Sequence, residues 1–398
     1  MEKQNTIMNI SLIIPSYNTD KHLINTYNSV RKYYKNVEMV IINDGSTDNT
    51  YGWLEALEDK NVIKINSKER KGHTFFYDEG MRQATNEIIG ILHSDMVIGP
   101  NYLENMLKHL ERGKVVCATR IEPPIHPPGL EKIVMDFGMD HNDLKLIEFE
   151  SFCKEKQTEF KDTTTKGIFA PWILYKEDHL SIGGHDQTFA PYGYEDSDIF
   201  NRWILAGYEM VQSRDAFVYH LTCRGHRWNK GVGIVNDDYE STMNRCRRDF
   251  IRKWGDWIKN DEYQFPIINP KYNIGFIVKN CNPQFLETLE PWCSNIYVDE
   301  GNVLTMIKNY IAKEQPNTPF DLYERIRSIL AEPENDILIE IDSKTFDHDD
   351  FQMLQLLAGV IAEGGEVGEF ELGNMKITIN DLKTFEKDLI FITNGNNE

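Results

Sequence analysis

The chain has 398 residues, of which 40% are hydrophobic, and this length and composition suit two globular domains. Its net charge of −20 argues against bulk binding to a nucleic-acid backbone, which needs a basic surface. No window approaches the roughly 18 apolar residues of a membrane-spanning helix, and no signal peptide or cysteine-based zinc pattern is evident, so we expect a cytoplasmic protein without a membrane span.

The first part of the chain alternates strand-like and helix-like segments. Apolar runs predict strands at residues 10–15, 38–44, 61–67 and 87–95, and the segments between them predict helices at 20–35, 48–58 and 75–84. Because strands separated by helices pair in parallel, this pattern predicts an α/β fold with a mostly parallel sheet and helices on both faces.

Three of these predicted strands end on polar residues. In chain order the ends carry Pro15-Ser16-Tyr17-Asn18, Asn43-Asp44-Gly45 and His93-Ser94-Asp95. Ligands of such sheets bind at the carboxyl ends of the strands, where the loops converge. Turn chemistry alone would explain any one of these loops. Their coincidence at one edge of the sheet indicates a binding site.

Two further signals lie between residues 166 and 227. Glu195 and Asp196 stand at the start of a predicted helix, where carboxylates also serve as ordinary caps. A later strand ends on His220, and Arg224 follows it closely. These residues are candidates for a second part of the site, with capping and solvated surface charge as the alternatives.

The alternating pattern restarts after a stretch with two prolines. We expect a first domain over residues 1–262, a linker over 263–272 and a smaller, acidic α/β domain over 273–398. From Phe265 onward the chain has 23 acidic and 10 basic residues. This second domain could hold an acceptor, mediate oligomers or dock a partner. Its apolar run at 353–362 predicts a buried helix.

The motifs of the first domain resemble those of the family 2 glycosyltransferases, which have the GT-A nucleotide-sugar fold. The similar segments, within residues 8–258, are "SLIIPSYN", "VIINDGSTDNT", "IGGHDQTF", "GYEDSDIFNRWILAGY" and "RRDFIRKWG". The metal motif of that family is usually D-x-D. Here His93-Ser94-Asp95 takes its place, with histidine instead of the first aspartate. No family is evident for residues 270–398.

The resemblance implies an inverting, metal-dependent transfer of a sugar from a nucleoside diphosphate, most readily a UDP-sugar, to an acceptor hydroxyl in glycan or polysaccharide synthesis. Mn²⁺ or Mg²⁺ would neutralise the diphosphate, with Asp95 and His220 as its protein ligands. Asp196 would be the general base, and Glu195 would position the base or the acceptor.

The resemblance also implies nucleotide contacts. Asp44 would bond to the base or ribose, and Tyr17 would stack on the base, with Pro15 and Asn18 forming the same wall. Three residues would shape the ribose and phosphate site: His93, Ser94 and Arg224. Arg224 as a solvated surface charge is an equal alternative.

Other functions fit part of the pattern. A nucleotidyltransferase would use a similar sheet, but its glycine-rich loop with a following lysine is absent near residue 15. A non-catalytic nucleotide-sugar-binding module would keep the fold, and His93 in place of aspartate agrees with it. The acceptor could also be a protein or a modified nucleic acid, although the negative charge makes nucleic acid a poor partner.

Overall fold

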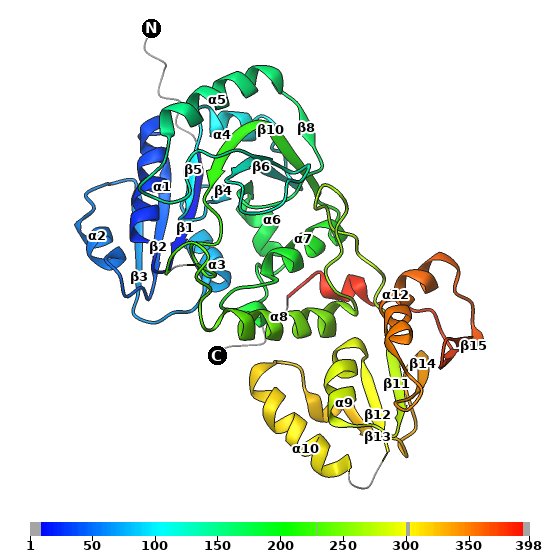
Figure 1. Ribbon diagram of the computed structural model, residues 1–398. Helices are drawn as coiled ribbons and strands as arrows, with labels where there is room; N and C mark the ends of the chain where they lie inside the picture. Colours follow the sequence, from blue (N-terminus) through cyan, green and yellow to red (C-terminus); the bar gives the residue numbers. More distant parts are fainter. Residues whose placement is uncertain (1–8, 229, 300–302, 393–398) are drawn as a thin grey trace. The chain divides into compact units, whose positions relative to one another are not determined.

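The structure, a computed structural model, describes residues 9–228, 230–299 and 303–392. They form two compact units, each with its own sheet (Figure 1). The first unit contains the described residues up to Glu240, the segment Asn260–Pro266 and the residues from Phe391. The second contains Ser241–Lys259 and Ile267–Ile390.

The sheet of the first unit has ten strands in the order β3-β2-β1-β4-β9-β6-β10-β5, with β7 beside β6 and β8 beside β10. Their bounds are β1 Ile10–Ser16, β2 Glu38–Asp44, β3 Val62–Ser67, β4 Ile88–Ile91, β5 Met96–Ile98, β6 Lys114–Glu122, β7 Lys132–Val134, β8 Thr164–Thr165, β9 Trp172–Tyr175 and β10 Glu209–His220. Strands β5, β8 and β9 run against the direction of the others. The expectation of a mostly parallel α/β sheet is confirmed.

Helices cover both faces of this sheet. Their bounds are α1 Asp20–Tyr33, α2 Thr50–Ala56, α3 His73–Gln83, α4 Tyr102–Leu107, α5 Leu146–Glu159, α6 Lys176–Ser181 and α7 Glu195–Leu205, with a 3₁₀ turn at Gln187–Phe189. Leu12 and Ile14 of β1 pack in one cluster with Leu23 of α1. Ile13 points to the other face, where Gly80 of α3 packs against it. The alternation follows from the two-residue period of a strand.

The second unit has a six-stranded sheet in the order β13-β12-β11-β14-β16-β15. The strands are β11 Ile274–Lys279, β12 Asn295–Val298, β13 Ile326–Ser328, β14 Ile337–Asp342, β15 Gly368–Leu372 and β16 Met375–Ile379. The helices are α8 Tyr239–Trp254, α9 Pro283–Leu289, α10 Val303–Glu314, α11 Leu322–Arg325 and α12 His348–Gly364, with 3₁₀ turns at Glu290–Trp292, Gln315–Asn317 and Glu386–Leu389.

Most of α8 belongs to the second unit, although the sequence-based division groups it with the first domain. Ile251 packs into the hydrophobic core of the second unit. The buried Arg252 donates hydrogen bonds to Glu290, at 2.7 Å from Nη2 to Oε2. This helix therefore contributes both apolar and ionic contacts to the second unit.

Helix α12 is only half buried. The expectation of a buried helix at 353–362 is therefore correct for the helix face that meets the core and wrong for the opposite face, which is exposed. Leu354, Leu357 and Ile361 lie in the core. Leu356 and Val360 are 54% and 59% exposed. Among the helices of the described ranges, none has the length and apolar character to cross a membrane.

Candidate active site

The loops after β1 and β2 are joined at one edge of the first sheet. These strands are parallel neighbours, so their carboxyl ends lie side by side. The backbone N–H of Asn18 donates to Ser46 Oγ at 3.0 Å, and Asn18 Oδ1 accepts from the backbone N–H of Thr47 at 2.7 Å. Asn18 has a positive φ of 54°, a conformation that asparagine tolerates better than most residues. Pro15 is buried within β1.

Asp44, at the end of β2, holds the segment before α3. Its two carboxylate oxygens accept the backbone N–H groups of Lys71 and Gly72 at 2.6 and 2.9 Å. Burial raises the pKa of Asp44, and these two donors oppose the rise. The segment carries Arg70, whose guanidinium lies 4.0 Å from the centre of the Tyr17 ring. Tyr17 and Arg70 thus form one cation–π wall beside Asp44.

A second group of side chains comes together because β5 pairs with β10. Met96 of β5 lies opposite His220 of β10, so Asp95, one residue earlier, reaches the histidine. His220 Nε2 is 3.5 Å from Asp95 Oδ1. The ring of His93 lies 5.6 Å from that of His220, and the ligand atoms of all three side chains lie within 4.8 Å of one another. The residues predicted at two strand ends therefore form one cluster.

The charges in this cluster suit a divalent cation. Burial alone would raise the pKa of Asp95, but His220 and His93 hold it well below the usual range, so the carboxylate is ionised. Burial lowers the pKa of His93 to about 3, which leaves a neutral imidazole. Burial acts in the same direction on His220, but Asp95 and Glu122 raise its pKa to about 9, so a cation would have to displace the proton on this imidazole. One carboxylate with neighbouring imidazoles is a donor set that Mn²⁺ accepts.

Glu122, the last residue of β6, orients His220 from behind. Its Oε1 lies 3.3 Å from His220 Nδ1, on the side of the ring away from Asp95. A carboxylate on the second ring nitrogen fixes the orientation of metal-binding histidines in many proteins. This contact leaves His220 Nε2 directed at Asp95.

Ser94 and Arg224 lie against the same cluster. Ser94 Oγ and Thr19 Oγ1 are hydrogen-bonded at 2.8 Å, which ties the end of β4 to the loop after β1. The backbone N–H of Arg224 donates to Asp95 Oδ2 at 3.2 Å. The side chain of Arg224 is 2% exposed, and its Nε and Nη1 atoms make no hydrogen bond to the described residues. A buried guanidinium with unused donors fits an anionic ligand.

Glu195 and Asp196 form the first turn of α7, where the helix dipole favours carboxylates. Glu195 is fixed on both oxygens: Oε1 lies 2.6 Å from His73 Nε2, and Oε2 accepts the backbone N–H of Gly193. The close approach of α3 that brings His73 here requires glycine at position 72. A Cβ at Gly72 would lie 2.2 Å from backbone atoms of Pro191.

The two carboxylates titrate in opposite directions. Burial would raise the pKa of Glu195, but the His73 partner outweighs it and lowers the pKa. Burial and the adjacent Glu195 charge both raise the pKa of Asp196. A carboxylate with a raised pKa is the better proton acceptor once it is ionised. The pair therefore contains one anchored anion, Glu195, and one carboxyl group with a raised pKa, Asp196.

A row of aromatic rings joins the carboxylate pair to the histidine–aspartate cluster. The ring of Tyr77 stacks on that of His93 with 6.4 Å between centroids, and it lies 5.2 Å from the ring of His73. His93 in turn contacts His220, and His73 bonds to Glu195. All these side chains belong to the first unit, and the ring contacts link the two parts of the predicted site.

Three further residues of this site were not singled out from the sequence: His73, Tyr77 and Glu122. Glu122 ends a strand, so the reasoning that identified Asp44 and Asp95 applies to it as well. His73 and Tyr77 lie four residues apart on α3, and that spacing would have placed both on one helix face. Nothing in their spacing reveals the contact between His73 and Glu195, which are 122 positions apart.

Comparison with known families gives two matches. The model of glycosyl transferase family 2 matches residues 11–176. A model described as the N-terminal domain of galactosyltransferase matches residues 152–224. The first covers the loops after β1, β2 and β4, and the second covers α7 and the end of β10.

Curated relatives match over part of their length. The chain is 26% identical over 228 residues to validoxylamine A glucosyltransferase of Streptomyces hygroscopicus subsp. limoneus, covering 52% of this chain and 50% of that protein. It is 30% identical over 105 residues to glycosyltransferase GlyG of Streptococcus pneumoniae, covering 26% of this chain and 35% of that one. The chain thus spans at most about half the length of these two relatives.

Solved structures that are similar to part of this chain include Staphylococcus aureus TarS 1–349 in complex with UDP, at 18% identity and a TM-score of 0.39 over 53% of this chain and 60% of that one. Another is the mannosyltransferase PcManGT of Pyrobaculum calidifontis with GDP-Man and Mn²⁺, at 17% identity and a TM-score of 0.40 over 63% and 62% of the two chains. The match of the family model over residues 11–176 agrees with the resemblance that the motifs of this segment indicated.

Proposed function

We propose that the first unit transfers a sugar from a nucleoside diphosphate, most readily a UDP-sugar, to an acceptor hydroxyl in glycan or polysaccharide synthesis, with Mn²⁺ or Mg²⁺ and with inversion. The match to the glycosyl transferase family 2 model over residues 11–176 supports the reaction class, as does the relative described as a glucosyltransferase. The observation that carries the proposal is the link between the His93–Asp95–His220 cluster and the Glu195–Asp196 pair in one centre.

The cluster fits a divalent cation with Asp95 and His220 as ligands and His93 beside them. Such a cation, when bound, would neutralise the charge that develops on the leaving diphosphate. The unused donors of the buried Arg224 would bond to phosphate oxygens. Tyr17 and Asp44 lie at the neighbouring strand ends, where the base and ribose would bind. The metal cluster and Arg224 would then bind the diphosphate of the donor, and Tyr17 and Asp44 would bind its nucleoside.

Asp196 would accept the proton of the acceptor hydroxyl as the new glycosidic bond forms. Its raised pKa makes it a stronger base than an ordinary aspartate. Glu195 is held by His73 and Gly193, so it would position its neighbour and would not act as a nucleophile. A single base without a covalent intermediate corresponds to one displacement, and one displacement inverts the anomeric carbon.

The experiment compares wild type with Asp196→Asn. Transfer from each of a panel of UDP-, GDP-, dTDP- and CMP-sugars, with and without Mn²⁺, identifies the donor. We expect Asp196→Asn to lose roughly 10²- to 10⁴-fold in turnover. Donor binding should persist, because Asp196 is assigned to the acceptor hydroxyl. A thermal-shift measurement detects this binding, since ligand at about 100 times its Kd stabilises the fold by about 2.7 kcal/mol.

Glu177→Gln is the matched control, because Glu177 also lies in a first helical turn but its side chain is 84% exposed. It should behave as wild type. Full turnover of Asp196→Asn would exclude Asp196 as the base. The absence of any nucleotide-dependent shift in wild type would exclude the donor site itself.

A further inference from the structure

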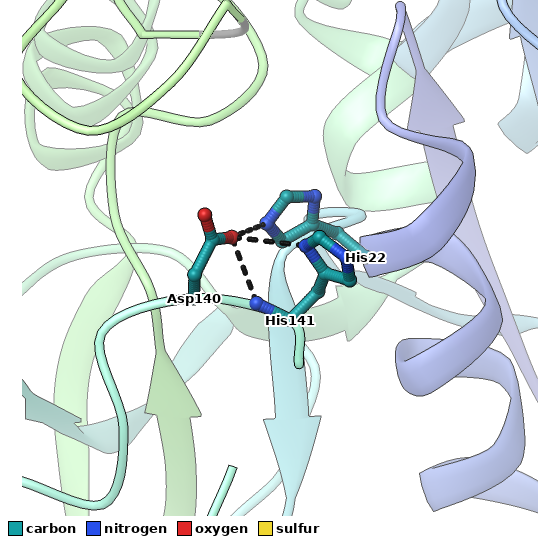
Figure 2. A group of neighbouring side chains, drawn as sticks. All are labelled: His22, Asp140 and His141. Carbon is teal, nitrogen blue, oxygen red and sulfur yellow. Dashed lines mark hydrogen bonds and ion pairs between the residues drawn. The ribbon is translucent and has the colours of Figure 1, made fainter. Parts of the chain in front are cut away.

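Three side chains outside the donor site converge on one point of the first unit. His22 lies in the first turn of α1, and Asp140 and His141 lie between β7 and α5 (Figure 2). Their ligand atoms are within 4.8 Å of one another. More than a hundred residues of chain separate His22 from the other two, so the fold alone brings them together.

The separations are close to those of a tetrahedral metal site. His22 Nε2 and His141 Nδ1 lie 2.8 and 3.2 Å from Asp140 Oδ1. Zinc bonds to nitrogen and oxygen of about 2.0–2.1 Å place tetrahedral ligand atoms about 3.3 Å apart. The two imidazole nitrogens would therefore need to move away from Asp140 Oδ1 by at most about half an ångström around an ion.

One carboxylate oxygen of Asp140 faces more nitrogen atoms than it can accept from. Oδ1 lies near His22 Nε2, His141 Nδ1 and the backbone N–H of His141, the last at 2.8 Å. A carboxylate oxygen offers about two lone-pair sites. Figure 2 shows all three contacts meeting at this atom, with the other carboxylate oxygen directed away. An imidazole nitrogen facing this point can therefore keep its lone pair for a cation.

Neighbouring groups hold this arrangement in place. Asp143 accepts the backbone N–H groups of Met139 and Asp140 at 3.0 and 2.7 Å. Asn25 of α1 donates to the carbonyl oxygen of His141 at 2.9 Å. The segment that carries Asp140 and His141 is thus held by hydrogen bonds within its own loop and by one to α1. Such support around the ligands is what a metal site requires.

Partial exposure distinguishes this cluster from the buried group formed by Asp78, His179 and His185 in the first unit. The side chains of His22, Asp140 and His141 are 13%, 32% and 34% exposed, which leaves room for an ion to enter and for a water ligand. Asp78 and its two histidine partners are at most 4% exposed. That second group is closed to solvent and acts as a structural network.

We propose that His22, Asp140 and His141 bind a Zn²⁺ ion, with water as the fourth ligand, at a site separate from the donor-site metal. Two imidazoles and one carboxylate favour zinc over Mg²⁺ or Ca²⁺. Arg224 connects the two sites: its backbone N–H bonds to Asp95, and its Nε lies 3.9 Å from Asp140 Oδ1. An ion at Asp140 would therefore act on the arginine that we assign to the diphosphate.

The test measures Zn²⁺ binding alone, by titration against a chromophoric chelator and by metal analysis after dialysis. The proteins are wild type, Asp95→Asn, His141→Ala and the double variant. His348→Gln is the control, because His348 is an exposed histidine of the second unit. We expect Asp95→Asn to retain one tightly bound Zn²⁺ and His141→Ala to lose that ion, with affinity reduced at least about 10-fold. The control should match wild type.

Equal tight Zn²⁺ binding by Asp95→Asn and by the double variant would overturn the proposal, as would the absence of tight Zn²⁺ in Asp95→Asn. Thermal melts in a chelator check the fold: removal of zinc should lower the Tm of Asp95→Asn and leave that of the double variant unchanged. If His141→Ala does not fold, His22→Gln in the same background takes its place. Because only metal binding is measured, failure here leaves the proposed transfer reaction unaffected.

Discussion

At the scale of single residues, the sequence identifies chemically reactive side chains better than it identifies the residues that contact them. Asp95, His220 and Asp196 stand out because a carboxylate or imidazole at the end of an apolar run, or in a first helical turn, is conspicuous. His73 is not conspicuous, yet it bonds to Glu195 at 2.6 Å. Such contacts depend on where two distant loops meet. The pKa difference within the Glu195–Asp196 pair follows from that contact and could not be inferred without it.

Replacement of His73 by glutamine should impair the proposed base, Asp196, without removing the proposed donor site. His73 stabilises the ionised carboxylate pair, and its charge lowers the pKa of both members. Its loss should move the acidic limb of the turnover–pH profile to higher pH, because the pair then holds a proton more tightly. Looser positioning should reduce turnover at neutral pH by roughly 10- to 100-fold.

Steady-state kinetics from acid to alkaline pH tests this prediction, with KM for the sugar donor expected to stay near the wild-type value. His109→Gln, a change in the chain after α4, is the control. A variant His73→Gln with reduced turnover but an unshifted acidic limb would show that His73 serves only to pack the loop.

Glu122 offers a second test at this scale. It bonds to His220 Nδ1, so Glu122→Gln should weaken the orientation of the imidazole and lower the affinity for Mn²⁺ at the proposed donor site by roughly 10- to 100-fold. Titration of the nucleotide-dependent thermal shift with Mn²⁺ measures that affinity. Glu131→Gln is a suitable control, since Glu131 contacts the same Arg120 but not the histidine. An unchanged Mn²⁺ midpoint would contradict the role of Glu122.

At the scale of elements, periodicity predicted the first three strands of the first sheet well, but it missed β6 and did not reveal which strands pair. The predicted strands at 10–15 and 38–44 correspond to β1 and β2 within one residue. The pairing of β5 with β10, which puts Asp95 beside His220, joins segments more than 100 residues apart. The run at 353–362 was misleading for a related reason. An apolar stretch reports hydrophobicity but not which helix face meets the core.

The attachment of α3 yields a prediction about stability. Asp78 of α3 accepts hydrogen bonds from His179 and His185 at 2.9 and 2.7 Å in a fully buried site. Removal of one partner from such a network typically costs about 3–5 kcal/mol. Asp78→Asn should therefore lower the free energy of unfolding by about 3 kcal/mol or more at neutral pH, as measured by chemical denaturation. Glu79→Gln, an adjacent and more exposed change on the same helix, should have little effect.

The pH dependence of this difference follows from the direction of the Asp78 pKa. Burial would raise it, but the two histidines lower it below its ordinary value in the folded state. A lowered pKa contributes stability that is complete above the unfolded-state value and is lost as pH falls through the folded-state value. The difference between wild type and Asp78→Asn should shrink on acidification. A difference that grows toward acid pH would contradict this assignment.

At the scale of the whole molecule, the alternation of strands and helices begins again after the proline-containing stretch and indicates a second α/β unit. The position of the border between the two units depends on α8. Its basic residues suggest an exposed surface when the sequence is considered alone. The structure instead buries Arg252 against Glu290 and Asp249, within the second unit. Charge along a helix does not reveal whether the partners are water or buried carboxylates. That distinction required the tertiary structure.

Fragments of the second unit test this border. A fragment of residues 241–390 keeps α8, whereas 273–390 loses it. In the shorter fragment Glu290 retains Arg325 but lacks Arg252, and the core lacks Ile251. An incompletely paired buried carboxylate costs about 3–5 kcal/mol, which is a large part of the roughly 5–15 kcal/mol that stabilises a domain.

The longer fragment should unfold cooperatively, and the shorter one should show broad amide NMR signals and no sharp transition. Equal cooperativity of the two fragments would place α8 outside the folding unit and return the border to the proline-containing stretch.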